Sequence, residues 1–259
     1  MLKYFALPVV GFLIGLLVVM LGGGGGIAYV GILTAFFNIP AAIAVSTSLA
    51  TIIPTTGAGA FSHWKAGNLN LRLGFIMLIG GVFGSVVGSL CSSLVPQNIY
   101  NKLTGVIMLL LCAQMFISYL RKKRKKDHEK EQPERKFISS VTVKAISFGV
   151  LGGLMSGLIG LSGGTSIVAG LVILGCNSLE TIGTSAFVLF GISITGFIMH
   201  LGLGSVDWKL VGFLIIGTSS GAFVGPLLLK HLDKAKTEKF LQPSLFIMII
   251  VMGILLLFK

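Results

Sequence analysis

The 259-residue chain contains little charge for its length. Charged residues make up 11% of it, hydrophobic residues make up 54%, and the mean hydropathy is +0.97. A soluble domain carries about 25% charged residues, so more than half of the usual solvating surface is missing. The net charge of +12 does not indicate nucleic-acid binding, because nine of the twenty Lys and Arg lie within residues 121–136 and most others flank apolar runs. We therefore expect an integral membrane protein.

Features typical of enzymes and cation sites are also absent from the sequence. The three cysteines form no CxxC motif and predict no disulfide framework. There is no G-x-S-x-G, H-E-x-x-H or Walker A motif, so we predict no catalytic residue, cofactor or metal site and no enzyme. All eight acids fall within residues 121–136 or at the ends of apolar runs, which leaves no carboxylate in mid-membrane. This favours an anion pathway, and leaves open Na⁺ held by carbonyls and hydroxyls or protons carried by His.

The chain divides into ten apolar runs: 5–21, 27–37, 41–62, 73–95, 99–120, 142–159, 165–175, 180–200, 210–229 and 241–258. A helix needs about 20 residues to cross a bilayer, so most runs qualify but 27–37 and 165–175 are too short. Each short run follows a glycine-rich break, Gly22–Gly26 or Gly160–Gly164. We predict an all-α polytopic membrane protein in which each half has a glycine-broken first helix followed by a short half-helix. No A-x-A cleavage site follows 5–21, so this run is expected to be a retained span.

The second half of the sequence repeats the first. At an offset of 138 the coincident pairs are Gly11/Gly149, Gly15/Gly153, Gly22/Gly160, Gly25/Gly163 and Gly26/Gly164. After one deletion near Asn38, an offset of 137 aligns Thr47/Thr184, Ser48/Ser185, Gly59/Gly196, His63/His200, Gly67/Gly204, Gly80/Gly217, Gly84/Gly221 and Gly88/Gly225. The His pair is the hardest to obtain by chance, because the chain has only four His. We predict two homologous transmembrane repeats, 1–120 and 137–259, joined by a basic cytoplasmic linker at 121–136.

The relative orientation of the repeats depends on the path through each break. A chain that continues straight through gives parallel repeats, whereas a chain that turns back gives inverted repeats. Both arrangements place residues 121–136 and the loop with Lys65 and Arg72 on the cytoplasmic side, where Lys and Arg are enriched. Only the inverted arrangement also places four further lysines there, namely Lys230, Lys234, Lys236 and Lys239. We therefore predict inverted repeats with both termini outside.

The two breaks are the predicted binding site. Broken backbone in a membrane must be buried in protein or line a cavity. Half-helices that begin near Ile27 and Thr165 would direct amide donors and the positive end of the helix dipole at the breaks. Two such ends in mid-membrane could bind an anion without a charged side chain. The alternative is that the glycines only permit close helix packing, which is the reading we prefer for Gly80, Gly84 and Gly88.

Hydroxyl and imidazole groups extend this hypothesis. Hydroxyls on the long segment after each half-helix could donate to the same anion, or only to the backbone of the preceding turn. The predicted substrate-binding residues are Gly22, Gly24, Gly25, Gly26, Thr47, Ser48, Gly160, Ser162, Gly163, Gly164, Thr165, Thr184 and Ser185. His63 and His200 end the next segments, either as interfacial residues or as a symmetric pair of gating or proton-sensing groups.

The G-x-G-G-G break, its second copy, the following Thr-Ser pairs and the basic linker resemble the TauE/SafE family of sulfite and organosulfonate exporters. Gly22, Gly24, Gly25 and Gly26 match the first motif, with Gly23 where an apolar residue is common. Gly160, Gly163 and Gly164 match the second, with Ser162 in place of a glycine. The resemblance implies a plasma-membrane permease for a small sulfur-containing or carboxylate anion, usually moving outward.

We accordingly expect a secondary carrier that exports a small anion such as sulfite, a sulfonate or sulfoacetate by alternating access. The alternatives are anion uptake coupled to protons or sodium, an anion channel, and a membrane scaffold without transport. The expected partners are the anionic substrate and the lipid bilayer, with no nucleic acid. The sequence indicates no particular oligomeric state.

Overall fold

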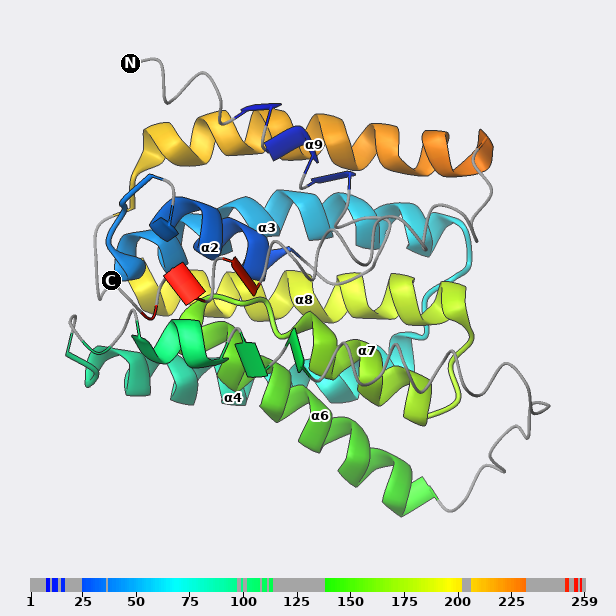
Figure 1. Cartoon of the computed structure of the whole chain (residues 1–259). Helices are drawn as coiled ribbons and strands as arrows, with labels where there is room; N and C mark the ends of the chain where they lie inside the picture. Colours follow the sequence, from blue (N-terminus) through cyan, green and yellow to red (C-terminus); the bar gives the residue numbers. More distant parts are fainter. Residues whose placement is uncertain are drawn as a thin grey trace.

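The computed structural model describes residues 8–9, 11–13, 15–16, 25–35, 37–96, 99, 102–107, 109–110, 112–113, 138–201, 206–231, 250–251, 254–255 and 257. The regular structure of these residues is entirely helical, which confirms the predicted all-α class (Figure 1). The principal helices are α2 (Gly26–Ala35), α3 (Ala41–Lys65), α4 (Leu71–Ser93), α6 (Ile138–Ile159), α7 (Gly164–Ile173), α8 (Ser178–Leu201) and α9 (Trp208–His231). The predicted linker 121–136 lies outside the described residues.

Four helices in the described part of the chain are long and apolar enough to cross a membrane: Ile43–Lys65, Leu71–Ser93, Val141–Ile159 and Leu179–Leu201. On α4 the outward side chains are large and apolar, with Ile79 69% and Phe83 66% exposed. A soluble protein does not expose a face of this kind, whereas lipid accommodates it. The two half-helices, α2 and α7, have ten residues each and rise only about 15 Å.

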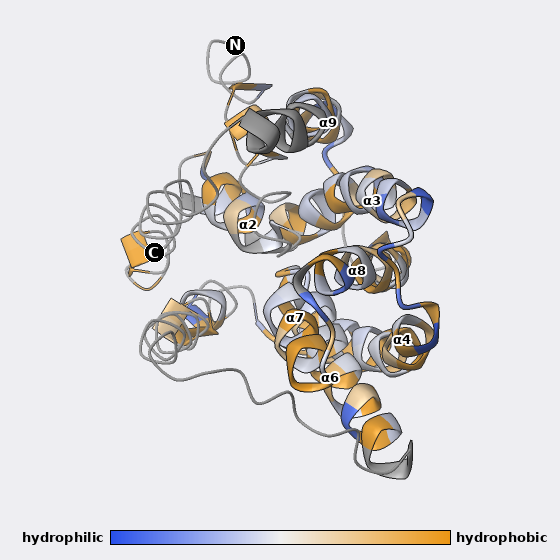
Figure 2. Ribbon diagram, turned by 90° about the vertical axis from the view of Figure 1, so that its right-hand side faces the viewer, coloured by the Kyte–Doolittle hydropathy of each residue, from blue (hydrophilic) through white to orange (hydrophobic). Residues whose placement is uncertain are grey.

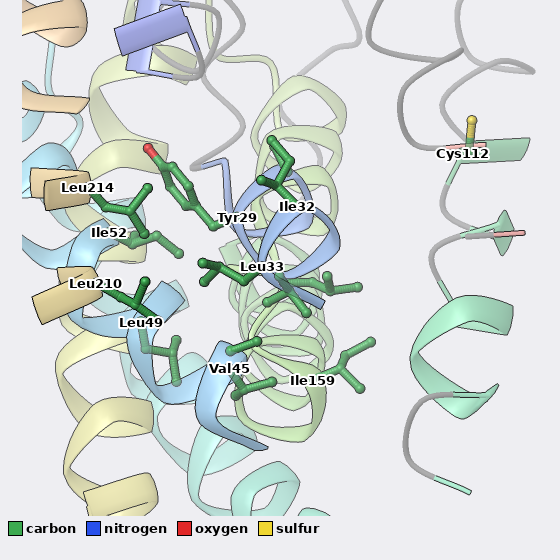
Figure 3. Packing of buried hydrophobic residues seen from close by; sticks show 14 residues of the cluster. Tyr29, Ile32, Leu33, Val45, Leu49, Ile52, Cys112, Ile159, Leu210 and Leu214 are labelled. Atoms are coloured by element: carbon green, nitrogen blue, oxygen red, sulfur yellow. The ribbon is translucent and has the colours of Figure 1, made fainter. Parts of the chain in front are cut away.

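The helices form two groups (Figure 2). One group, here called the first bundle, contains α2, α3 and α9. Their side chains, together with Ile159 at the end of α6 and Leu161, form an apolar core around Tyr29, Leu33 and Leu49 (Figure 3). The second bundle contains α4, α6, α7 and α8, with a separate core around Met77, Ile167, Leu171 and Ile192. The two bundles meet where α3 lies against α8.

Glycine positions bring the paired helices into backbone contact. A Cβ on Gly80 or Gly84 of α4 would overlap the backbone of Ile146 or Val150 of α6. The two residue numbers rise together, so α4 and α6 run parallel. The packing role predicted for Gly80, Gly84 and Gly88 is therefore confirmed.

The same contacts recur between α9 and the described residues near the N-terminus. Gly217 meets Pro8, and Gly221 meets Phe12. Adding 137 to Gly80 and Gly84 gives Gly217 and Gly221, and subtracting 138 from Ile146 and Val150 gives Pro8 and Phe12. These contacts are therefore the repeat equivalents of Gly80–Ile146 and Gly84–Val150. Likewise Gly15 meets Thr218, as Gly153 meets Gly81. Residues 8–16, as far as they are described, therefore belong to the first bundle.

Helix starts recur with the same spacing. The helices α2 and α7 begin at residues 26 and 164, α3 and α8 at 41 and 178, and α4 and α9 at 71 and 208, which are offsets of 138, 137 and 137. The side chains that cap the N-termini of α4 and α9 occupy equivalent positions in the two repeats. Asn70 Oδ1 accepts from Leu73 N, and Asp207 Oδ1 accepts from Leu210 N, both at 3.2 Å.

The helices α3 and α8 cross in the opposite sense. Gly59 of α3 contacts Ala186 of α8, and Leu49 of α3 contacts Gly196 of α8. One residue number rises as the other falls, so the two helices are antiparallel. The two contacts are equivalent in the repeat, because adding 137 to Gly59 gives Gly196 and subtracting 137 from Ala186 gives Leu49.

Candidate functional site: the junction of two helix breaks

The second break separates α6 from α7. The helix α6 ends at Ile159, and positive φ angles follow at Gly160 (66°), Ser162 (59°) and Gly163 (60°) before α7 begins. Glycine adopts this conformation readily, whereas a serine in it costs about 1–2 kcal/mol. All residues from 160 to 164 are buried. The broken backbone is therefore enclosed by protein, as predicted.

The half-helices start in the same way after both breaks. Ala28 N and Tyr29 N donate to the Gly25 carbonyl oxygen at 2.9 and 3.1 Å, and Ser166 N and Ile167 N donate to the Gly163 oxygen at 3.2 Å each. Gly25 and Gly163 both have positive φ angles, of 70° and 60°. Each helix begins at the next residue, one position earlier than the Ile27 and Thr165 that the sequence predicted. Gly22 and Gly24 lie outside the described residues.

The two breaks meet each other. A Cβ on Gly26 would lie 2.6 Å from the Gly160 oxygen, 2.7 Å from the Leu161 carbonyl carbon and 2.8 Å from the Ser162 nitrogen. The first residue of α2 therefore packs directly on the backbone of the second break. No side chain among those described caps α7, whose N-cap residue is Gly163. Thr165 is half-buried in the first turn of α7.

The helix α3 forms one wall of this junction. The space that a Cβ on Gly160 would need is occupied by Val45, whose Cγ1 would lie 2.8 Å away. Ser48 donates its hydroxyl hydrogen to the Gly160 oxygen at 3.4 Å. Thr47 is fully buried, and its hydroxyl has no hydrogen-bond partner among the described residues. Thr47 and Ser48 thus lie at or next to the second break.

Thr184 and Ser185 do not lie there. The Thr184 hydroxyl oxygen accepts from Asn70 N at 2.9 Å, and Ser185 donates to the Ile182 oxygen at 2.9 Å. Because α8 is antiparallel to α3, these residues lie beside the loop that connects α3 to α4, at the far end of α3 from Ser48. The structure therefore does not gather all four predicted hydroxyls at one place.

The chain matches the family described as sulfite exporter TauE/SafE over residues 7–256. The chain belongs to the TauE/SafE family. It is 30% identical to the probable membrane transporter protein YdhB of Bacillus subtilis, covering 95% of this chain and 97% of that protein. It is 26% identical to YunE of Bacillus subtilis (100% and 98%) and 30% identical to MJ0441 of Methanocaldococcus jannaschii (75% and 71%), both also called probable membrane transporter proteins. No solved structure matches it.

The family confirms the resemblance seen in the sequence and supports a membrane transporter role. Within this TauE/SafE protein the two predicted histidines have different surroundings. His63 is half-buried at the end of α3, close to Gly183, and its Nδ1 has no partner among the described groups. His200 is 3% exposed, and its Nδ1 lies 2.9 Å from the Gly196 oxygen and 3.4 Å from Ser89 Oγ. The two imidazoles therefore do not form equivalent sites.

A stripe of buried threonines on α3 was not predicted from the sequence. Thr47, Thr51 and Thr55 are four residues apart and share one face of the helix. Thr51 donates to the Thr47 oxygen at 2.8 Å, and Thr55 donates to the Thr51 oxygen at 3.0 Å. The stripe leads away from the break junction along the first bundle.

The stripe ends at a cluster of hydroxyls from three helices. Thr55 Oγ1 lies 3.5 Å from Thr218 Oγ1 of α9, and the buried Tyr29 hydroxyl of α2 lies near both without a hydrogen-bond partner among the described residues. The offsets of 137 and 138 assign apolar residues to these positions in the second bundle: Val188 for Thr51, Ile192 for Thr55, Ile167 for Tyr29 and Gly81 for Thr218. The sequence signal that could have revealed the stripe is this four-residue Thr spacing, which the other half of the TauE/SafE chain lacks.

Proposed function

We propose that this TauE/SafE protein is a secondary carrier that exports a small sulfur-containing or organic anion, such as sulfite, a sulfonate or sulfoacetate, across the cell membrane. The contact between Gly26 and the backbone of residues 160–162 is the observation that carries this proposal. It brings the amide end of α2 to the break that precedes the amide end of α7. The first amides of a helix have no acceptor within the helix, and such ends bind anions. The anion is proposed to bind there, with Thr47 as an additional donor.

The charge distribution supports an anionic cargo. In the four membrane-spanning helices the one acid is Glu180, in the first turn of α8, where its carboxylate accepts from Asn177 N. A buried carboxylate near the junction would repel an anion. A potential of about 100 mV, negative inside, contributes about 2.3 kcal/mol per charge, or a roughly 50-fold outward bias. Export can then run downhill.

The mechanism we propose is alternating access between two inverted repeats, 1–120 and 137–259. The antiparallel crossing of α3 and α8 supports it, because equivalent helices of inverted repeats run in opposite directions. The recurrence of the Gly80–Ile146 contact as Gly217–Pro8 also supports it. Each bundle combines segments of both repeats, and the two bundles would rock about the α3–α8 contact to expose the junction to either side. In this arrangement residues 121–136 are cytoplasmic and both termini are outside.

Proteoliposomes containing the full chain and radiolabelled sulfoacetate would test the function. We expect flux whose direction reverses with the sign of an imposed membrane potential, without any requirement for sodium. Uptake that occurs only with an inward proton or sodium gradient would support coupled import instead. Single-channel conductance far above carrier turnover would support a channel, and absence of flux for sulfoacetate, sulfite and simple sulfonates would refute the proposal.

A further inference from the structure

His200 lies in a buried polar cluster that joins three helices of the second bundle. Its Nδ1 is 2.9 Å from the carbonyl oxygen of Gly196, one turn earlier on α8. Because a carbonyl oxygen can only accept, Nδ1 carries the proton and donates it, which leaves the lone pair on Nε2. Ser89 of α4 has its hydroxyl oxygen 3.4 Å from His200 Nδ1 and donates to the Gly157 oxygen of α6, also at 3.4 Å. The tautomer and the plane of the ring are thus fixed by the protein.

The Nε2 atom has no hydrogen-bond partner among the described residues and is shielded from solvent. Buried polar atoms in proteins are almost always paired, so an unpaired basic nitrogen indicates a missing partner. A proton on Nε2 would turn this acceptor into a cation.

The cluster adjoins the break junction. Gly157 is three residues before Gly160, about 4.5 Å along the helix axis. On the opposite side, Leu49 of α3 packs against Gly196, and its neighbour Ser48 donates to the Gly160 oxygen. The residue that Ser89 links to the imidazole, Gly157, therefore lies about one helical turn from the proposed anion site.

The charged groups on the helices packed around His200 lie at their far ends. They are Lys65 on α3, Arg72 on α4, Lys144 on α6 and Glu180 on α8. His200 lies near the C-terminus of α8 and beside Ser89 near the C-terminus of α4, and Ser89 in turn bonds to Gly157 near the C-terminus of α6. Each of these three positions is more than ten residues from the charged residue of its helix. Among the described groups, no fixed charge is close enough to decide the protonation of Nε2, so the charge of a bound ligand would decide it.

The equivalent histidine lacks this environment. His63 lies near Gly183 and the loop at Asn68. The residue that corresponds to Ser89 in the repeat is Pro226, which has no hydroxyl. His63 therefore serves as a matched control for His200.

We propose that His200 is a proton-binding site that fills when an anion occupies the junction of the two breaks, an inference that rests on the proposed function. A proton from water adds to the Nε2 lone pair, while Nδ1–H remains bonded to the Gly196 oxygen. The anion stabilises the resulting imidazolium, and by reciprocity the proton raises the affinity for the anion. Anion binding therefore takes up a proton, and anion affinity decreases as the pH rises. With a dianionic cargo the loaded site keeps one net negative charge, so outward flux remains driven by the membrane potential.

Isothermal titration calorimetry of the full-length protein with sulfoacetate, in two buffers of different ionisation enthalpy between pH 6 and 8, measures the proton uptake. Sulfoacetate is suitable because its carboxyl group, with an ordinary pKa near 4, and its sulfonate stay ionised in this range. For the wild type we expect proton uptake and a dissociation constant that rises by up to about tenfold per pH unit, the limit for one linked proton. His200→Asn keeps a donor for the Gly196 oxygen and removes Nε2, so it should bind sulfoacetate without proton uptake, whereas His63→Asn should behave as the wild type.

Three outcomes would overturn the inference and leave the proposed function standing. They are wild-type binding without proton uptake, proton uptake by His200→Asn equal to that of the wild type, and loss of proton uptake in His63→Asn. Absence of wild-type binding of sulfoacetate, sulfite and simple sulfonates at every pH would overturn both. If His200→Asn does not fold, Ser89→Ala keeps the imidazole and removes the hydroxyl next to Nδ1. This variant should shift the pH midpoint of proton uptake, and an unchanged midpoint would contradict the role of the cluster.

Discussion

The place where Gly26 would carry a side chain is filled by the carbonyl oxygen of Gly160, 2.6 Å from the position of a Cβ. These residues come from different halves of the sequence, and each belongs to a glycine-rich break. Close approach of two backbones is the reason that glycine is required at Gly26. The proposed anion site depends on this contact, because a separation of the breaks would leave each half-helix end alone.

Gly26→Ala tests the contact directly. The added methyl group must displace the backbone of residues 160–162, so we expect destabilisation of about 1–3 kcal/mol together with loss of sulfoacetate flux. Gly212→Ala is the matched control, because a Cβ there meets nothing within 4 Å. The melting temperature and the flux per folded protein should both be measured. A Gly26→Ala protein with wild-type flux would show that the junction is not the binding site.

Ser162 offers a comparison between two substitutions that both remove its hydroxyl. At a φ of 59°, Gly should be more stable than Ala by about 1 kcal/mol, because only Ala retains a Cβ in the left-handed region. If the hydroxyl binds the anion, Ser162→Gly and Ser162→Ala should weaken sulfoacetate binding equally despite their different stabilities. Calorimetric binding and thermal unfolding would separate the two effects. Affinities that follow the stabilities would indicate a purely conformational role.

The threonine stripe can be replaced by the residues that occur in the other half of the chain. The double variant Thr51→Val and Thr55→Ile introduces the side chains of Val188 and Ile192. Among the described residues, both threonines donate to the backbone of their own helix, and Thr55 also contacts Thr218. We therefore expect the fold to remain stable and the flux to decrease at least severalfold.

Thr56→Val is the control for the stripe. Thr56 makes the same type of bond, to the Ile52 oxygen at 2.8 Å, but lies on another face of α3. Equal flux in the stripe variant and the control would show that the hydroxyls of Thr51 and Thr55 do not contribute to transport.

Cys176, in the loop between α7 and α8, reports the orientation of the repeats. In the inverted arrangement α7 returns to the side from which α6 entered, so Cys176 is cytoplasmic, whereas parallel repeats place it outside. A Cys91→Ser, Cys112→Ser variant should react with a membrane-impermeant maleimide only after permeabilisation. Lys65→Cys in a background that also carries Cys176→Ser is the positive control, because both arrangements place residue 65 inside.

The reaction of Cys176 should depend strongly on pH. Burial, and to a lesser extent the Glu180 carboxylate, raise the pKa of the Cys176 thiol to about 11. The thiolate is the reactive form, so labelling should be slow at pH 7 and accelerate by about tenfold per pH unit up to that pKa. Labelling of intact cells at pH 9 would contradict the inverted arrangement.

The sequence was sufficient to locate both half-helices, because a glycine run followed by a ten-residue apolar helix is a local pattern. Their starts were predicted one residue late, since the helix begins immediately after the glycine with positive φ, at Gly26 and Gly164. Local patterns also indicated the packing role of Gly80 and Gly84.

Properties that depend on distant partners could not be predicted in this way. Thr184 aligns with Thr47 in sequence, but antiparallel packing places it next to Asn70 instead of the second break. His200 aligns with His63, yet His200 is buried and has Ser89 of another helix beside it, whereas His63 is half-buried. The threonine stripe was missed because hydropathy does not reveal which face of a fully buried helix carries its hydroxyls.

The exchange of segments between the two bundles has a consequence for synthesis at the ribosome. Residues 8–16 emerge from the ribosome well before their packing partners Gly217 and Gly221, which are translated about 200 residues later. During most of elongation, the glycines of residues 8–16 that pack against α9 have no partner helix to contact. Assembly is therefore completed only after α9 has been inserted. If the chain were cut at the linker, each half would lack helices that complete its bundle, since the first bundle needs α9 and the second bundle needs α4.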